Sequence, residues 1–399
     1  MRARVSLSDP KSRIICVCFV MAAIAWGSVF YGHSVYLAAL TDTGTWSVGQ
    51  ISTGIMIFWI SSLPGTLFVG YLIDSRGASW VVFTGACCVS FSLVGISLAK
   101  DLWFIFFCYG VMGFAYPAVG AASISATLSP WFSKDFGWAL GLSLTGASVG
   151  GAIIPALMMY AIGEMSFLLT MLVTGGIVFC VLSLLAFILT LTKPELTPLG
   201  PKTNFKNVFA ADLLTKRVFW RISIAAGMAL AGQVGFLAHQ IPIALQQTNE
   251  FGSVISVTIV AVSAAIGRLI TAYASRFLGV TQIAAFCYAL QGVGIFIVSF
   301  ADTTFSLWIG CAVAGLVVGA IVMLSPMLVR EAFGSANYGK NYAAVNLILY
   351  IFAGISPWFL GQMFDYYHSY GTGLVVLFFV QSLSAILILG KIVPEKISL

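Results

Sequence analysis

The chain has 399 residues, of which 60% are hydrophobic and only 8% are charged, and its mean hydropathy is +1.02. About a quarter of the residues of a soluble globular domain are charged, so this composition excludes a soluble fold and indicates that lipid surrounds most of the chain. The apolar runs are long and unbroken, as in residues 177–191. Strands of a membrane barrel would alternate polar and apolar residues instead. We therefore expect an all-α membrane protein.

Twelve apolar segments are long enough to cross a bilayer, which takes roughly 20 residues each. The first one follows four basic residues and has no cleavage site, so we expect a retained helix and not a signal peptide. The predicted spans cover residues 14–39, 48–72, 79–98, 102–129, 138–161, 166–191, 219–247, 252–275, 280–300, 305–329, 340–364 and 370–391. This spacing predicts two pseudo-symmetric six-helix bundles, 1–191 and 218–399, joined by a cytoplasmic linker at 192–217.

The lysines and arginines predict the orientation, because loops on the cytoplasmic side carry an excess of these residues. If the N-terminus is cytoplasmic, nearly every base falls at a cytoplasmic helix end, and Lys100 is the exception on the outer side. We expect a multi-pass protein of the cell inner membrane with both termini in the cytoplasm. The net charge of +6 is then mostly the excess of bases in the cytoplasmic loops, and no nucleic-acid partner is needed to explain it.

The residues that would carry covalent chemistry are missing from the sequence. The eight cysteines fall within predicted spans and lack the spacing of metal ligands. Neither a nucleophile–base set nor a Gly-Lys-Ser/Thr phosphate loop is present. We expect no metal, no cofactor and no enzymatic activity.

The two halves resemble each other in two places. His33 in the first span and His239 in the seventh both lie well past the middle of their helix, near its outer end. Arg76 follows the second span and Arg276 follows the eighth, in similar surroundings. Two related six-span halves are typical of transporters that hold their substrate at the midplane, between the repeats.

The segment from Gly70 to Gly77 has the pattern Gly-x-x-x-Asp-x-Arg-Gly, with Asp74 and Arg76. It resembles the cytoplasmic loop between the second and third spans of the major facilitator superfamily. The resemblance implies that Gly70, Asp74, Arg76 and Gly77 form a conformational latch. The alternative is an ordinary charged turn.

Finer motifs resemble the monocarboxylate and oxalate/formate transporter-like group of that superfamily. They are residues 131–141, in which Asp135 replaces an expected base, His239-x-x-Pro242, residues 337–342 and residues 354–365. The resemblance covers nearly the whole chain. It implies secondary active transport by alternating access, with a monomer as the working unit.

Arg268 is the one base that falls well inside a predicted span, away from the bases at the span ends, and the predicted spans contain no aspartate or glutamate. A guanidinium in a membrane costs several kcal/mol unless it is paired or lines an aqueous cavity. In a wet cavity it can bind a carboxylate through two parallel hydrogen bonds, and the resembling transporters use an arginine at this place. The alternative is that Arg268 extends to the cytoplasmic surface.

Two departures from the family pattern bear on the substrate and on coupling. No second base lies near Val345 or Asn346, which favours one carboxylate over two, and Ala264 stands where an aspartate would pair with the arginine. His239 and His33 remain as candidates for proton coupling, because imidazole titrates near neutral pH. The alternative is a neutral histidine with backbone or water partners, and for His33 we favour it.

Further polar and aromatic residues of the spans are candidates for the substrate site, because such groups prefer an interior partner over lipid. These candidates are Tyr31, Tyr116, Gln233, His239, Gln240, Asn346 and Tyr350. For Tyr31 the alternative is an aromatic anchor at the membrane interface.

The sequence therefore predicts a secondary active transporter of a small organic anion, a monocarboxylate, with a co-transported proton or a counter-anion. The alternative is a transporter of the same fold for a larger cargo, such as a siderophore, a drug or an amphipathic anion, in uptake or efflux. A channel or a sensor agrees less well with the latch-like loop and the short tails.

Overall fold

A computed structural model describes residues 9–132, 136–192, 211–334 and 338–390. The side chain of Asp74, residues 133–135 and 337 of the family-like motifs, and residues 193–210 of the predicted linker lie outside the described residues. The described part is almost entirely helical, which confirms the all-α fold class. The division of the chain at 1–191, 192–217 and 218–399 stays a prediction.

Twelve segments of the described chain are long and apolar enough to cross a membrane, as predicted. They are Pro10–Asp42, Val48–Ile73, Ala78–Leu98, Leu102–Leu128, Phe136–Glu164, Phe167–Leu191, Arg217–Ala238, Glu250–Ala274, Val280–Ser299, Thr304–Phe333, Lys340–Tyr367 and Gly371–Leu389. Most of their bounds lie within a few residues of the predicted ones. The largest difference is at the seventh span, where a helix predicted over 219–247 ends at Ala238.

The chain forms two compact units, which do not result from a single cut of the sequence. Unit 1 comprises residues 1–39 and 60–203, and unit 2 comprises residues 40–59 and 204–399. The helix α3 therefore begins in unit 2 and ends in unit 1.

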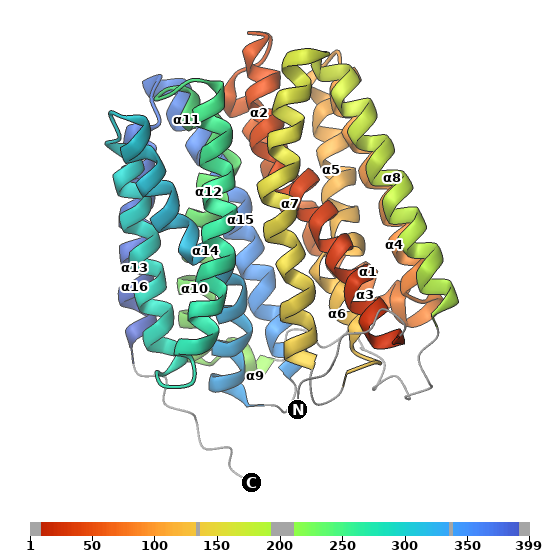
Figure 1. Cartoon of the computed structure of the whole chain (residues 1–399). Helices are drawn as coiled ribbons and strands as arrows, with labels where there is room; N and C mark the ends of the chain where they lie inside the picture. The colour runs from red at the N-terminus through yellow and green to blue at the C-terminus, as the bar shows by residue number, and fades with distance from the viewer. Residues whose placement is uncertain (1–8, 133–135, 193–210, 335–337, 391–399) are drawn as a thin grey trace. The chain divides into compact units, whose positions relative to one another are not determined.

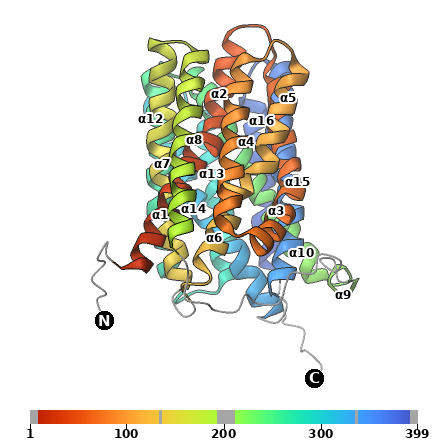
Figure 2. The same ribbon diagram turned by 90° about the vertical axis from the view of Figure 1, so that its right-hand side faces the viewer.

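Unit 1 contains the first helices and two breaks in them (Figures 1 and 2). Its elements are α1 (Pro10–Ala25), the π-helical segment η1 (Trp26–Phe30), α2 (Gly32–Asp42) up to residue 39, α3 (Val48–Arg76) from residue 60, α4 (Ala78–Leu98), α5 (Leu102–Val119), α6 (Ala121–Leu128), α7 (Phe136–Glu164) and α8 (Phe167–Leu191). The fourth span breaks at Gly120, between α5 and α6, just after Pro117. A proline removes one helical hydrogen bond and favours such a break.

Unit 2 contains the remaining helices, which are coloured from green to blue in Figure 1. They are α9 (Ala211–Leu214), α10 (Arg217–Ala238), α11 (Gln240–Leu245), α12 (Glu250–Ala274), α13 (Val280–Ser299), α14 (Thr304–Phe333), α15 (Tyr338–Tyr367) and α16 (Gly371–Leu389). The seventh span breaks at His239, which ends α10 and precedes α11. Asn249 begins α12 by accepting a hydrogen bond from the Gly252 amide at 2.8 Å.

Glycines bring helix backbones close together inside each unit. A Cβ atom on Gly146 or Gly150 of α7 would collide with the backbone carbonyl of Phe19 or Ala23 in α1. In unit 2, a Cβ on Gly267 of α12 would collide with the Leu316 carbonyl of α14. Small residues favour this kind of packing, because van der Waals contact between helices replaces the missing hydrophobic force in lipid.

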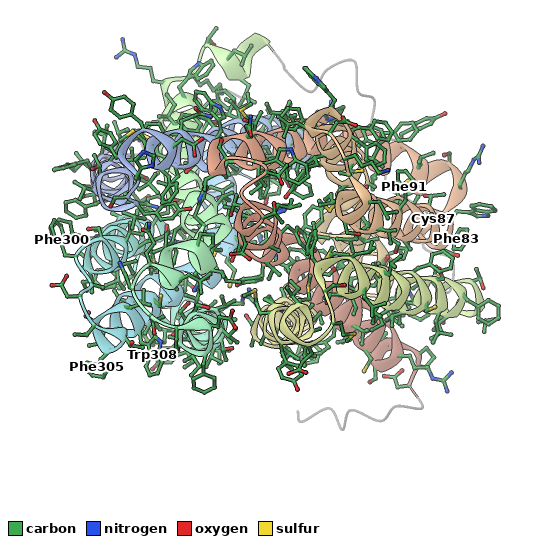
Figure 3. All side chains as sticks on the ribbon, turned by 90° about the horizontal axis from the view of Figure 1, so that it is seen from above. Phe83, Cys87, Phe91, Phe300, Phe305 and Trp308 are labelled. Atoms are coloured by element: carbon green, nitrogen blue, oxygen red, sulfur yellow. The ribbon has the colours of Figure 1, made fainter. Side chains whose placement is uncertain are left out.

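Large apolar side chains point away from the units. Phe83 and Phe91 lie two helical turns apart on α4 and are exposed, as are Phe300 and Phe305 in unit 2 (Figure 3). In water such a surface would be unfavourable, whereas acyl chains solvate it. The exposed aromatic residues thus agree with the bilayer location that the composition predicts.

Candidate functional site

The polar residues of unit 2 gather along one face of α15. Tyr342, Asn346, Tyr350, Pro357 and Asp365 follow one another after four, four, seven and eight residues, which are one or two helical turns, so they lie toward one side of the helix. The Tyr342 and Asn346 side chains are hydrogen-bonded to each other, one turn apart. Two of the predicted site residues, Asn346 and Tyr350, therefore lie on this side of α15, which we call the α15 stripe.

The first part of α3 packs on the same stripe within unit 2. The Trp59 ring meets the Tyr350 ring edge-on, with centroids 5.4 Å apart. A Cβ atom on Gly361 would lie only 2.5 Å from the Ser52 Oγ, so a glycine is needed for this close approach. The sequence had suggested Tyr350, but it did not suggest Trp59 or Ser52 as its neighbours.

His239 is fully buried and contacts three different elements. One ring nitrogen, Nε2, is 3.0 Å from the Pro357 carbonyl oxygen and 3.3 Å from Ser52 Oγ, and Nδ1 is 3.2 Å from the Tyr370 hydroxyl. A carbonyl can only accept, so Nε2 carries a hydrogen and donates it. In a neutral ring Nδ1 is then the acceptor, and the Tyr370 hydroxyl donates to it. The surroundings thus fix both the tautomer and the orientation of this histidine.

Gln240 and Gln233 are buried in different surroundings. The Gln240 side-chain amide donates to the Ser256 carbonyl at 2.9 Å and so links α11 to α12. Gln233 lies in α10, and its Oε1 has no hydrogen-bond partner among the described residues. The Gln240 contact joins helices α11 and α12 and does not involve the α15 stripe.

Two glutamines that the sequence reasoning missed form a buried polar link between helices of unit 2. The Gln381 amide of α16 donates to the Gln291 Oε1 of α13 at 2.6 Å and to the Ala229 carbonyl of α10 at 2.9 Å. Both glutamines are fully buried. Their polar side chains within predicted spans could have pointed to them in the sequence. Because their hydrogen bonds join α10, α13 and α16, we assign these glutamines a structural role.

Arg268 lies on α12, and Ala274 ends that helix six residues later. A Cβ atom on Gly319 would lie 3.2 Å from the Arg268 Cβ, so the base of the arginine side chain packs against α14. The residue as a whole is only partly buried. The structure therefore keeps Arg268 inside a spanning helix while leaving part of its side chain accessible.

The candidates in unit 1 surround η1. Tyr31 follows this segment directly, and the Tyr116 ring meets the Trp26 ring edge-on at 5.9 Å. His33 is buried, with its ring 5.7 Å from that of Tyr109 and 6.3 Å from that of Tyr36. Single π-turns often occur at functional sites, and here one adjoins two predicted site residues, Tyr31 at its end and Tyr116 against Trp26.

The latch-like segment lies at the junction of α3 and α4. Gly77 has a φ of 85°, a conformation that favours glycine, and it precedes the first residue of α4. Gly70 lies within α3, and Arg76 is exposed at its end. The Asp74 side chain is outside the described part, so the latch itself stays a prediction. Within the described ranges no three His, Cys, Asp or Glu side chains form a group that could hold a metal ion.

Twelve helices long and apolar enough to cross a membrane, with interruptions in the first, fourth and seventh, define a polytopic membrane protein. Residues 15–357 match the family model of the Major Facilitator Superfamily. The chain belongs to this superfamily.

Comparisons with individual proteins agree with that assignment. Human monocarboxylate transporter 11 is 27% identical over 252 residues, which are 60% of this chain and 53% of that protein. The agnestins efflux protein AgnL12 of Paecilomyces divaricatus is 32% identical over 121 residues, 28% of this chain and 27% of that protein. The chain thus spans about half of the length of the first relative and a smaller share of the second.

The fold also matches solved structures. A crystal structure of a variant of the nucleoside transporter NupG superposes with a TM-score of 0.77, at 12% identity, over 95% of this chain and 99% of that chain. Identity this low establishes the fold alone. The family and the fold are those of transporters and not of enzymes.

Proposed function

We propose that the protein is a secondary active transporter of a small organic monocarboxylate, and that Arg268 binds the substrate carboxylate. One observation carries the proposal. Arg268 lies within a spanning helix, whereas every acidic residue of the described spanning helices is in the first residue or the last three residues of its helix. The membrane interior therefore carries a positive charge that favours an anion. The similarity to monocarboxylate transporter 11 supports the same substrate class.

A guanidinium suits this role better than an ammonium would. Its planar fork donates two parallel hydrogen bonds to the two oxygens of one carboxylate. Each hydrogen bond to a charged group contributes about 1.5–3 kcal/mol. Losing two of them corresponds to a loss of affinity of about 100-fold or more.

The test is uptake of labelled monocarboxylates into proteoliposomes that contain the purified protein. Arg268→Gln should lower the apparent affinity by about 100-fold or abolish saturable uptake. Arg268→Lys keeps the charge but not the fork, so we expect a smaller loss, of about tenfold. Arg276→Gln is the matched control, because Arg276 is exposed just beyond the end of the same helix. Equal uptake by Arg268→Gln and Arg276→Gln would rule out the assignment.

The driving force is part of the same proposal. A proton that moves with the substrate would be carried by His239 or by His33, and exchange for a counter-anion would need neither. Uptake with and without an imposed pH gradient separates the two modes. If protons are coupled through His239, His239→Gln should abolish the stimulation by the gradient, while His33→Gln should keep it.

A second cargo class is supported by the similarity to a fungal efflux protein. In this alternative the substrate is a larger amphipathic anion, a siderophore or a drug, and the direction is export. Thermal-shift measurements with short and long organic acids distinguish the alternatives. Stabilisation by large amphipathic anions alone, with no response to short monocarboxylates, would favour export of the larger cargo.

The proposed location is the cell inner membrane, with both chain ends in the cytoplasm and the monomer as the working unit. The bases support this orientation: Arg76, Arg276, Arg330 and Lys340 would all face the cytoplasm, and Lys100 would face outward. Labelling of single cysteines at positions 76 and 100 in intact cells tests it. A reagent that cannot cross the membrane should label position 100 only.

A further inference from the structure

The first turn of α3 is capped twice, once locally and once from a distant helix. Ser47 Oγ accepts from the Gln50 amide at 3.2 Å, and Gln50 Oε1 accepts from the Ser47 amide at 2.9 Å. This is a reciprocal capping box. The Asp365 carboxylate, near the end of α15, then accepts from the Ser47 hydroxyl at 2.5 Å and from the Gly49 amide at 3.0 Å. We call these two bonds of Asp365 the gate contact.

The gate contact is favourable for a physical reason that involves charge. The first amides of a helix have no partner within the helix, and they carry the positive end of its dipole. A carboxylate placed there satisfies one amide and gains from the dipole. Asp365 supplies this carboxylate although 316 residues separate it from Gly49.

The close approach of the two helices leaves no room for a side chain larger than that of glycine at positions 49 and 361. A Cβ atom on Gly49 would lie 2.5 Å from the Asp365 Oδ2, and one on Gly361 would lie 3.0 Å from the Gly49 Cα. Larger residues at either glycine would separate the two helices. Sequence and geometry thus agree on a close approach of α3 and α15 at this end of unit 2.

Only the first part of α3 contacts α15 and His239. From Gly49 through Ser52 to Trp59 its contacts with α15 and His239 extend over about 15 Å. From residue 60 onward α3 belongs to unit 1. Pro64, a few residues further on, cannot donate the usual helical hydrogen bond and weakens the helix there. The two parts of α3 therefore belong to different units, so a movement of the whole helix with unit 1 would break its contacts with α15.

We propose that Asp365 is a gating residue, whose bonds to Ser47 and Gly49 hold one end of the transport path closed and break once in each transport cycle. This inference rests on the proposed transport function, and in the proposed orientation the contact lies on the outer side. Asp365 is only partly buried and Ser47 is exposed, so water replaces the lost bonds when the contact opens.

The experiment measures distances between spin labels and does not depend on knowing the substrate. Labels are attached at Thr45→Cys and Tyr366→Cys, two exposed positions beside the gate contact, in a protein whose native cysteines have been replaced. Asp365→Asn keeps the size of the side chain but removes its charge. We expect a shift toward the longer, open distance by about tenfold in population.

The controls separate this proposal from the substrate assignment. Asp302→Asn removes an exposed carboxylate from the loop before α14 and should leave the distances unchanged. Gly49→Ala places a methyl group against the Asp365 carboxylate on the α3 side of the contact, and it should also favour the open distance. If Asp365→Asn and Gly49→Ala both give the wild-type distances, the gate is excluded. If they shift while Arg268→Gln transports normally, the gate stands and the substrate site fails.

Discussion

His33 and His239 hold corresponding places in the two halves of the sequence, yet their surroundings have little in common. The ring of His33 lies between Tyr36 and Tyr109 and makes ring contacts. The ring of His239 is held by a backbone carbonyl, a serine hydroxyl and a phenol from three elements. The same residue at an equivalent position therefore makes ring contacts with two tyrosines in unit 1 and polar contacts with three partners in unit 2.

This difference shows how a repeat can diverge in function while it keeps its helices. Ring contacts tolerate exchange for another ring, because packing volume and shape are what matter. A buried hydrogen-bonded histidine does not tolerate such an exchange, because its former partners stay buried and lose a hydrogen bond. Substitutions at the two histidines should therefore have effects of different size.

The largest effect is expected for His239→Leu. This change leaves the buried Pro357 carbonyl and the Tyr370 hydroxyl without the imidazole, at a cost of about 1–3 kcal/mol for each unsatisfied group. We expect a destabilisation of about 3 kcal/mol, seen as a lower thermal unfolding temperature in detergent. His33→Leu is the matched control and should cost clearly less. Equal losses for the two variants would refute the distinction between the histidines.

A smaller effect is expected for Tyr370→Phe, which removes only the hydroxyl that donates to His239 Nδ1. The Asp365 carboxylate lies near enough to Tyr370 to interact with it electrostatically. The phenylalanine keeps the ring contact with Phe364, whose centroid lies 4.4 Å from that of Tyr370. We expect a loss of about 1 kcal/mol in the same unfolding measurement. No further loss when Tyr370→Phe is added to His239→Leu would show that the hydroxyl acts through the histidine.

The smallest effect is expected for His33→Phe. The new ring keeps an aromatic contact with Tyr36 and Tyr109, so the change in stability should stay below about 1 kcal/mol. Uptake should also keep its response to a pH gradient. A complete loss of that response in His33→Phe, with His239→Gln unaffected, would exchange the roles proposed for the two residues.

The spans could be predicted from the sequence because they depend on local composition alone. Twelve apolar runs of sufficient length define them, and turn residues such as Asn249 and Thr303 mark their starts. The break at His239 was missed because the apolar pattern continues into α11, so hydropathy gives no signal there. The π-turn at Trp26–Phe30 was missed for the same reason.

The contacts of the site were harder to predict, because they join residues far apart in the chain. Ser47 and Gln50 show a capping box in the sequence, but the second cap comes from Asp365, and no local pattern points to it. Asn346 and Tyr350 were found because polar residues stand out in a spanning helix. Their partners Tyr342 and Trp59 follow only from the packing of the helices.

The π-turn in the first span also determines which residues face which neighbours. A π-turn contains one residue more than an α-helical turn, so α2 is rotated by about 100° relative to an uninterrupted helix. A helical wheel drawn through residues 10–42 would misplace His33 and Tyr36 by that angle. Deleting a single residue from Trp26–Phe30 should therefore turn both side chains away from Tyr109, even though every amino acid of α2 is unchanged. In this span the count of residues, as much as their identity, carries the structural information.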